Sequence, residues 1–184
     1  RQIRSQSVPS RQAVERVAIA VLGSPFPNSS SEKITQLVLD SLKSKGWKTD
    51  IVELFELPSD ALLLRSKSDI VDAALNSVEA ADLVILASPT YRATYTGLMK
   101  VFFDQFPQDA LRGKLALPIQ TGGSADHSLT IEYGMSPMVR SLGALVLSNT
   151  IYAWGAHWEE DGSPNDLLSS LVTTAVEEVE TLTN

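Results

Sequence analysis

The sequence predicts an α/β protein with a doubly wound parallel sheet of five strands and helices on both faces. Three observations lead to this prediction. Short apolar runs alternate with helical patterns along the 184 residues, without internal repeats. Some of these runs are continuously apolar, as in strands that are covered on both faces. Glycine and hydroxyl residues follow the runs where helices begin, which is typical of ligand-binding loops.

The strands are predicted from apolar or alternating segments of five to nine residues. They are Val17–Leu22, Trp47–Leu54, Leu83–Ala87, Leu115–Gln120 and Ala144–Tyr152. At this length the alternation favours the flavodoxin-like strand order 2-1-3-4-5, in which ligands bind at the carboxyl ends of the first and third strands. The loops after Leu22, Ala87 and Gln120 should therefore carry the chemistry.

The helices are predicted from apolar residues at helical spacing. They are Ser31–Gly46, Asp69–Ala81, Thr96–Phe106, Asp126–Leu142 and Asp166–Leu182. We expect Gly46 to cap the first helix and Gly134 and Pro137 to distort the fourth. The connection Phe55–Ser68 is expected to be a loop with a short helical stretch at Asp60–Arg65. The buried faces are expected to hold Ile70, Ala73, Ala74 and Val78 in the second helix, and Leu167, Leu168, Leu171, Val172, Ala175, Val176 and Val179 in the last.

The composition limits the possible domain organisation and the possible classes of binding partner. Residues 16–184 are expected to form a single domain. Residues 1–15, which are rich in Arg and Ser, are expected to be an N-terminal extension: a targeting remnant, an oligomer-clasping arm or a loosely ordered tail. The net charge of −7 argues against a nucleic-acid partner, and no apolar run is long enough to span a membrane. The lack of cysteine fits a cytoplasmic protein and excludes metal sites built from thiolates. The two histidines are too few for a histidine-rich metal site, so no bound metal is expected.

The first loop has the parts of a phosphate cradle. After Gly23, it contains Ser24 and then the cluster Ser29, Ser30 and Ser31, which opens a helix. Serine hydroxyls and the unpaired N–H groups of a helix N-terminus are all donors to phosphate. The Walker lysine and the G-x-G-x-x-G pattern are absent, so the loop suits the single phosphate of a mononucleotide such as FMN.

The second and third loops suit the polar edge of a flat heterocycle. Pro89, Thr90, Tyr91 and Arg92 offer a fixed backbone and hydrogen-bond donors, and Thr96 is expected to cap the following helix. In the third loop, Thr121 precedes Gly122 and Gly123, whose missing Cβ atoms let the backbone approach a ring. Their N–H groups are expected to face the electron-accepting edge of a flavin.

These motifs resemble the NADPH-dependent FMN reductase family, and among its members the alkanesulfonate-type two-component FMN reductases. The resemblance runs from about Val17 to Leu147 and rests on the three loops together with TYTG (94–97), ALRGK (110–114) and HSLTIEY (127–133). It implies a flavodoxin-like fold, FMN with NADPH or NADH, and hydride transfer to the flavin. No catalytic acid or base is needed, because the flavin accepts the hydride and the protein aligns the reactants.

The resemblance also implies roles for the loop residues. Ser24 and Ser29–Ser31 would hold the phosphate, Pro89–Arg92 would line the isoalloxazine, and Thr121–Gly123 would close its other side. Arg92 would also meet the phosphate of NADPH. The phosphate loop lacks the arginine that is frequent in the family, which predicts weaker phosphate binding and suits a flavin that leaves after reduction.

Some alternatives stay open at this point. Reduced FMN could pass to a flavin-dependent monooxygenase, or FMN could be retained to reduce quinones, azo dyes or metal oxyanions, or the chain could be a flavodoxin-like electron carrier. The apolar segment Tyr95–Phe106 suggests a homodimer or homotetramer. Tyr133 is either a π-type turn residue at a subunit interface or an ordinary core or interface tyrosine. His127 is a ligand contact, or a helix cap or packing group. Trp154, His157 and Trp158 shield the site or a neighbouring subunit, or pack in the core.

Overall fold

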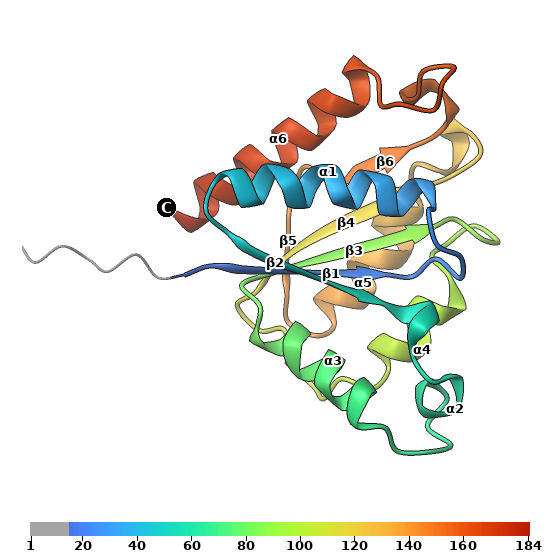
Figure 1. The fold of residues 1–184 in the computed structure, drawn as a ribbon, viewed down its shortest axis with the longest axis vertical. Helices are drawn as coiled ribbons and strands as arrows, with labels where there is room; N and C mark the ends of the chain where they lie inside the picture. The colour runs from blue at the N-terminus through green and yellow to red at the C-terminus, as the bar shows by residue number, and fades with distance from the viewer. Residues whose placement is uncertain (1–14) are drawn as a thin grey trace, which may run out of the picture.

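The sheet has the strand order that the sequence predicts. The computed structural model describes residues 15–184, so the predicted extension lies outside the described residues apart from Glu15. Within this range, six strands form one sheet, with all pairs parallel and the order β2-β1-β3-β4-β5; β6 also pairs with β4 (Figure 1). The strands are β1 (Val17–Leu22), β2 (Lys48–Glu53), β3 (Leu83–Pro89), β4 (Leu115–Thr121), β5 (Leu145–Val146) and β6 (Ile151–Ala153).

Helices cover both faces of this sheet. One face packs against α1 (Ser30–Ser44) and α6 (Asp166–Thr183), and the other against α3 (Asp69–Ala80), α4 (Gly97–Phe103) and α5 (Ser136–Arg140) (Figure 1). Successive residues of β1 alternate between the two cores, with Ala18 in the first and Ile19 in the second. This double burial explains why the central strands are continuously apolar.

The helices begin at residues that cap them. Ser29, Ser68, Thr96 and Asn165 each accept a hydrogen bond from a first-turn N–H group of α1, α3, α4 and α6. Gly46, with a φ of 88°, ends the first helix as expected. The short helix α2 is Ser59–Leu62, within the stretch expected to be loop and helix.

Two predicted helix faces need correction. In α3 the buried face holds Val71 and Val78, whereas Ile70 is 63% exposed and Ala73 is also exposed. In α6 Leu167 is 60% exposed, because it lies in the first turn and points away from the sheet. In both helices the sequence offered apolar residues on more than one face, so spacing alone did not select the buried set.

The predicted fourth helix and fifth strand are each divided. The helix becomes a 3₁₀ turn at Ala125–His127, a π-helix at Ile131–Met135 and α5, with Pro137 in the first turn of α5. The strand becomes β5 and β6. Leu115 of β4 pairs with Leu145 of β5, whereas Ile119 of β4 pairs with Ile151 of β6. Between these two pairs the edge segment is two residues longer than β4. It therefore leaves the sheet between β5 and β6.

Glu178 of α6 holds the connection between β5 and β6. Its two carboxylate oxygens accept hydrogen bonds from the N–H groups of Ser148 and Asn149 at 2.8 and 2.7 Å, and from the Asn149 side chain. Partial burial disfavours the charged carboxylate, but these hydrogen bonds outweigh it and hold the pKa of Glu178 below its ordinary value.

The Glu178→Gln variant should therefore be less stable at neutral pH, by about 1 kcal/mol. A lowered pKa in the folded state stabilises the fold above the ordinary glutamate pKa, and this contribution is lost as the pH falls through the lowered value. Denaturant unfolding between pH 3 and 8 checks this, with Glu177→Gln as the exposed control. A difference that stays constant over this range would contradict the prediction.

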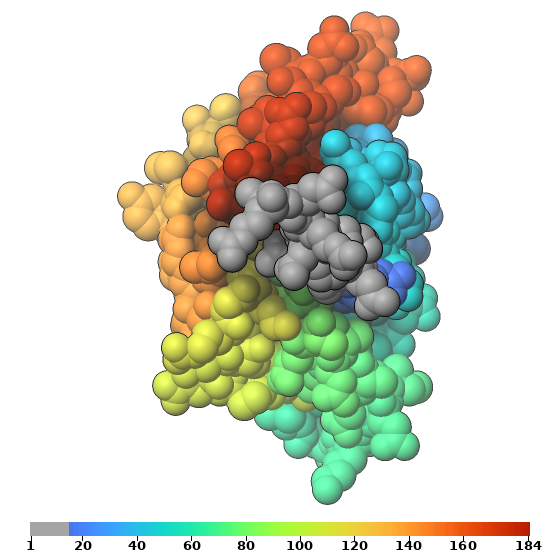
Figure 2. All heavy atoms as spheres, turned by 90° about the vertical axis from the view of Figure 1, so that its left-hand side faces the viewer, coloured from blue at the N-terminus to red at the C-terminus, as the bar shows by residue number. Residues whose placement is uncertain are grey.

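The amino ends of the strands form the side of the molecule that Figure 2 faces. There the last turns of α6 (red) lie beside the end of α1 (cyan). The Trp47 indole donates to Glu180 at 2.7 Å, and the Arg16 guanidinium lies 5.7 Å from the Trp47 ring and donates to the Thr183 carbonyl oxygen. The start of β1 and the end of α6 are thus tied together.

Within residues 15–184, every helix is too short or too polar to cross a bilayer.

Candidate functional site

The three predicted loops meet at the carboxyl ends of the strands. They enclose a cavity of about 370 Å³, called here the switch-point cavity, whose volume lies in the range of small-ligand sites. Its lining includes one residue of α1 and parts of the second and third loops, followed by a segment after β6. The lining residues are Ser30, Pro89, Thr90, Tyr91, Thr121, Gly122, Gly123, Ala153, Trp154, Gly155 and Trp158.

The first loop brings the N-terminus of α1 to this cavity. Ser29 accepts a hydrogen bond from the N–H of Glu32 at 3.2 Å, and its hydroxyl lies 3.0 Å from that of the buried Ser31. Ser30 at the first helical position is exposed and lines the cavity. The buried Ser24 forms a local turn, because its hydroxyl donates to the carbonyl oxygen of Phe26. One part of the predicted phosphate cradle, the N-terminus of α1, thus lies at the cavity. Ser24, the other part, shapes the loop behind that terminus.

Thr96 joins the first loop to the second. Its buried hydroxyl donates to the Gly23 carbonyl oxygen at 2.6 Å and accepts from the N–H of Met99 at 3.2 Å. The buried Ser88 hydroxyl accepts from the Thr96 N–H and donates to the Pro89 carbonyl oxygen. These contacts set the path of the second loop as it leaves β3.

Arg92 lies at the tip of a small hairpin beside the cavity. The N–H of Tyr91 donates to the Thr94 carbonyl oxygen at 2.8 Å, and Arg92 and Ala93 between them both have positive φ values, 49° and 68°. Two such residues form the tight turn of a two-residue hairpin. Arg92 is exposed there and stands outside the residues that line the cavity.

The third loop is held by the strand beside it. The N–H of Gly122 donates to the Ala153 carbonyl oxygen at 3.0 Å, and the Tyr152 hydroxyl donates to the Ser124 carbonyl oxygen at 2.6 Å. The expectation that both glycine N–H groups face a flavin is therefore wrong for Gly122. A Cβ atom at Gly122 would lie 2.0 Å from the Tyr152 hydroxyl, so close approach requires glycine here. Partial burial, together with the negative charge of Asp126, raises the pKa of Tyr152 and keeps this donor protonated.

Aromatic residues after β6 close the cavity on the remaining side. Trp154 and Trp158 line it, and the His157 imidazole accepts from the Trp154 N–H at 3.3 Å. This position answers the alternative that the sequence left open: the tryptophans border the site, and Trp158 also packs against the core. His127 is exposed in the 3₁₀ turn and does not line the cavity. Among residues 15–184, no three His, Asp or Glu side chains converge as metal ligands.

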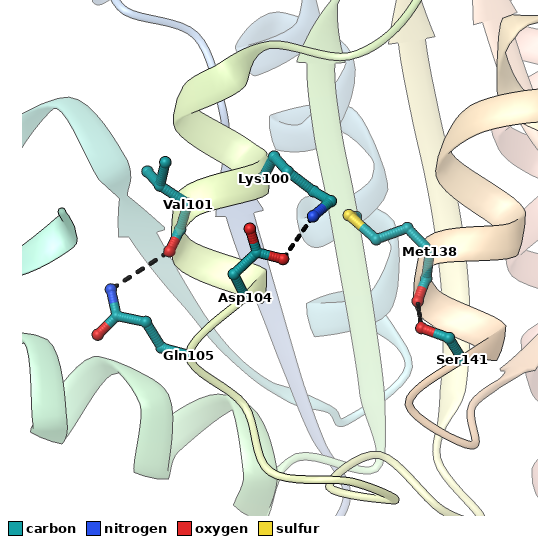
Figure 3. Close-up of polar contacts among 6 residues, drawn as sticks. All are labelled: Lys100, Val101, Asp104, Gln105, Met138 and Ser141. Carbon is teal, nitrogen blue, oxygen red and sulfur yellow. Dashed lines mark hydrogen bonds and ion pairs between the residues drawn. The ribbon is translucent and has the colours of Figure 1, made fainter. Parts of the chain in front are cut away.

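A second, larger cavity lies away from the strand ends, between α4 and the π-helix with α5. We call it the lateral cavity; its volume is about 520 Å³. Lys100 and Asp104 on α4 form an ion pair at 2.5 Å, and Met138 of α5 faces them across the gap (Figure 3). Partial burial raises the pKa of Tyr95 on the same wall. The volume alone does not make this the active site, because the three loops and the helix N-terminus lie at the other cavity.

The π-helix lies on the rim of the lateral cavity. A Cβ atom at Gly134 would lie 2.4 Å from the Thr94 hydroxyl, so the Thr94 side chain would have to turn to admit any larger residue. Tyr133 is 81% exposed, which excludes the core alternative and confirms the π-type turn. Leu129, just before the π-helix, is 59% exposed.

The strand order and the position of the switch-point cavity define a flavodoxin-like α/β protein, a fold class in which ligands bind at this edge of the sheet. The chain belongs to the NADPH-dependent FMN reductase family, whose pattern matches residues 17–159. Two relatives match this chain over stretches of similar length. The FMN reductase (NADPH) of Escherichia coli K12 is 31% identical over 138 residues, which cover 73% of this chain and 71% of that protein. The NADH-dependent FMN reductase SfnF of Pseudomonas putida is 32% identical over 140 residues, which cover 73% and 75%.

A solved structure has the same fold over most of the chain. The apo form of the NADH:FMN oxidoreductase EMOB superposes with a TM-score of 0.82 and 30% identity, covering 90% of this chain and 89% of that one. The predictions of the family, the fold class and an oxidoreductase are thus confirmed.

Sequence reasoning gave no role to Ser88, Gln120 and Tyr152 behind the cavity wall, nor to the lining residues Ala153 and Gly155. Ser88 and Gln120 are fully buried polar residues that follow apolar runs in β3 and β4. That contrast was a readable signal, because a polar residue in a doubly covered strand must find a partner. Tyr152 carried no such signal, since its contact with the third loop depends on how β6 returns to the sheet.

Proposed function

We propose that this protein binds FMN in the switch-point cavity and reduces it with NADPH or NADH. The observation that carries the proposal is the cavity itself, formed at the switch point by the loops that the family resemblance implies. The relatives' names include both NADPH and NADH as reductants, so both cofactors belong to the proposal.

The phosphate of FMN would lie at the open end of α1. The Ser29 cap occupies the N–H of Glu32, which leaves the N–H groups of Ser30 and Ser31 at the helix terminus for an anion. The Ser30 hydroxyl is the exposed donor beside them. The net charge of −7 does not prevent this, since donors in contact act at short range whereas distant surface charges are screened over about 8 Å.

The isoalloxazine ring would lie between the second and third loops. Bound FMN supplies the two-electron acceptor for the nicotinamide hydride. The protein's part is alignment: Pro89–Tyr91 border one side and Thr121–Gly123 the other. Trp154 and Trp158 supply an apolar wall that excludes water from the ring. Arg92, exposed on its hairpin, would meet the extra phosphate of NADPH.

We propose that reduced FMN leaves the protein and supplies a flavin-dependent monooxygenase. The phosphate loop without arginine supports release, because it offers only neutral donors. This chemistry depends on reduced nicotinamide nucleotides, so we also propose a cytoplasmic location. The alternative within the same fold is an enzyme that retains FMN and reduces quinones, azo dyes or metal oxyanions.

The experiment that tests the proposed function is the visible spectrum of the purified protein, followed by NADPH and NADH oxidation with and without added FMN. A colourless protein that is active only with added FMN supports flavin release. A yellow protein that reduces quinone without added flavin supports retention. Protein that neither binds flavin nor oxidises either nucleotide would refute the proposed function.

We also propose that the protein is a homodimer or homotetramer. Most of the apolar excess in Tyr95–Phe106 is absorbed by the chain's own core, where Met99, Phe102 and Phe103 are buried. An apolar surface remains around the π-helix, where Tyr133 is exposed on the rim of the lateral cavity and Leu129 is exposed just before the π-helix. In Figure 2 the light-orange segment before α5 stands out from the side of the molecule, where a second copy would have access.

The Tyr133→Lys variant should therefore lower the oligomeric state. Placing a cation in an apolar contact leaves a charge without a partner, which typically weakens association by several kcal/mol. Light scattering after size-exclusion chromatography would measure the molar mass at several concentrations. Ile70→Lys on α3 is the matched control, since Ile70 is also exposed but lies on a different part of the surface. Equal molar masses for wild type and Tyr133→Lys would count against this interface.

A further inference from the structure

Gln120 is a buried polar residue that follows the apolar run Leu115–Ile119 in β4. Its side chain is 0% exposed, and its amide nitrogen donates to the Thr90 hydroxyl oxygen at 3.0 Å. Its amide oxygen has no hydrogen-bond partner among the described residues. An unpaired buried acceptor is destabilising, so stability does not explain why glutamine stands at this position. A residue that is kept buried without a hydrogen-bond partner for its oxygen is typical of a functional position.

The contact with Gln120 determines what the Thr90 hydroxyl does. The backbone N–H of Thr90 donates to the Thr121 carbonyl oxygen at 2.7 Å, which fixes the residue at the rim of the sheet. A hydroxyl has one hydrogen, and an oxygen that accepts from an amide keeps this hydrogen for another acceptor. Within residues 15–184, Gln120 is the one hydrogen-bond partner of this hydroxyl. Thr90 lines the switch-point cavity, so this hydrogen is available to an acceptor on a molecule that enters the cavity.

We propose that Gln120 is a positioning residue that holds the Thr90 hydroxyl as a donor toward the flavin. This inference rests on the proposed function. The polar edge of an oxidised isoalloxazine carries carbonyl oxygens and unprotonated ring nitrogens, all of which are acceptors. A hydroxyl that is free to rotate offers its hydrogen only part of the time, whereas one held by Gln120 is preorganised as a donor. Thr90 thereby favours a ligand that has a hydrogen-bond acceptor next to the Thr90 hydroxyl.

A double-mutant cycle tests the inference, with the FMN dissociation constant measured by quenching of flavin fluorescence. Gln120→Met keeps the shape and apolar packing but removes the amide, and Thr90→Val removes the hydroxyl. Each should weaken FMN binding about three- to tenfold, the value of one neutral hydrogen bond. The double variant should bind no more weakly than Thr90→Val alone, because Gln120 acts only through that hydroxyl. Thr90→Ser should restore most of the affinity.

Thermal unfolding separates this role from simple packing. Gln120→Met removes the unpaired oxygen, so its melting temperature should be unchanged or higher while its FMN affinity falls. Ser136→Ala is the matched control: its hydroxyl is also buried without a partner but lies on α5, outside the cavity lining. This control should leave FMN binding unchanged.

The possible failures are distinguishable. Wild-type protein that binds no FMN overturns the proposed function and this inference with it. Wild-type binding with unaltered affinity in Gln120→Met, or additive losses in the double variant, overturns the positioning role alone.

Discussion

Gly122→Ala is expected to weaken FMN binding about tenfold or more and to lower the free energy of unfolding by about 1–3 kcal/mol. The added methyl group would lie 2.0 Å from the Tyr152 hydroxyl and 3.0 Å from the ring carbon that carries it. The tyrosine would have to turn away, which breaks its hydrogen bond to the Ser124 carbonyl oxygen and frees the third loop. Flavin titration and denaturant unfolding measure the two effects.

Two further variants identify the cause. Gly123→Ala meets no atom within 4 Å, so the fold should keep its stability. If the third loop borders the isoalloxazine, however, this methyl group should still obstruct flavin binding. Tyr152→Phe in the Gly122→Ala background removes the closest contact and should recover part of the lost stability. If Gly122→Ala proves as stable as wild type, the close approach of Tyr152 does not constrain the loop.

Thr96→Val should destabilise the protein by about 2–4 kcal/mol although the side chain keeps its shape. The threonine hydroxyl is the N-cap of α4, which is worth about 1 kcal/mol, and it also satisfies the carbonyl oxygen of Gly23. Leaving that buried carbonyl without its partner costs about 1–3 kcal/mol more. Because the same hydroxyl joins the first loop to the second, FMN affinity should fall along with stability. Chemical denaturation and flavin titration provide the two measurements.

Thr96→Ser is the matched comparison. Serine keeps both hydrogen bonds and loses one methyl group, which corresponds to about 1 kcal/mol. The serine variant should therefore be clearly more stable than the valine variant. The reverse order would show that packing of the methyl group, and not the hydrogen bonds, holds the two loops together.

The sequence predicted the fold well where local pattern and burial agree. The strand order and the central strands follow from continuous apolar runs, and the helix starts follow from hydroxyl caps such as Thr96. The failures occur where local pattern is ambiguous. Ile70 fits a helical stripe as well as Val71 does, and only packing against the sheet selects Val71. The edge strand reads as one segment, because nothing local shows that two extra residues leave the sheet between β5 and β6.

The sequence predicted where the candidate site lies in the fold, but not every residue that lines or supports it. Strand order alone places the three loops together, and seven of the eleven predicted residues line the switch-point cavity. Four predicted residues lie outside that lining. Three are Ser24, Ser29 and Ser31, whose hydroxyl groups cap a helix or shape a turn. The fourth is Arg92, which lies in the turn of its hairpin. Residues that act from behind the surface, such as Gln120 and Tyr152, depend on contacts between strands that no local pattern contains.

The contacts of Arg16 with Trp47 and Thr183 have a practical consequence for handling the enzyme. They place the start of β1 and the end of α6 at the edge of the sheet opposite the three loops (Figure 1). A support or a fused monooxygenase attached through this edge would leave the mouth of the switch-point cavity uncovered. An immobilised enzyme tethered in this way should therefore exchange flavin with the surrounding solution as freely as the untethered protein.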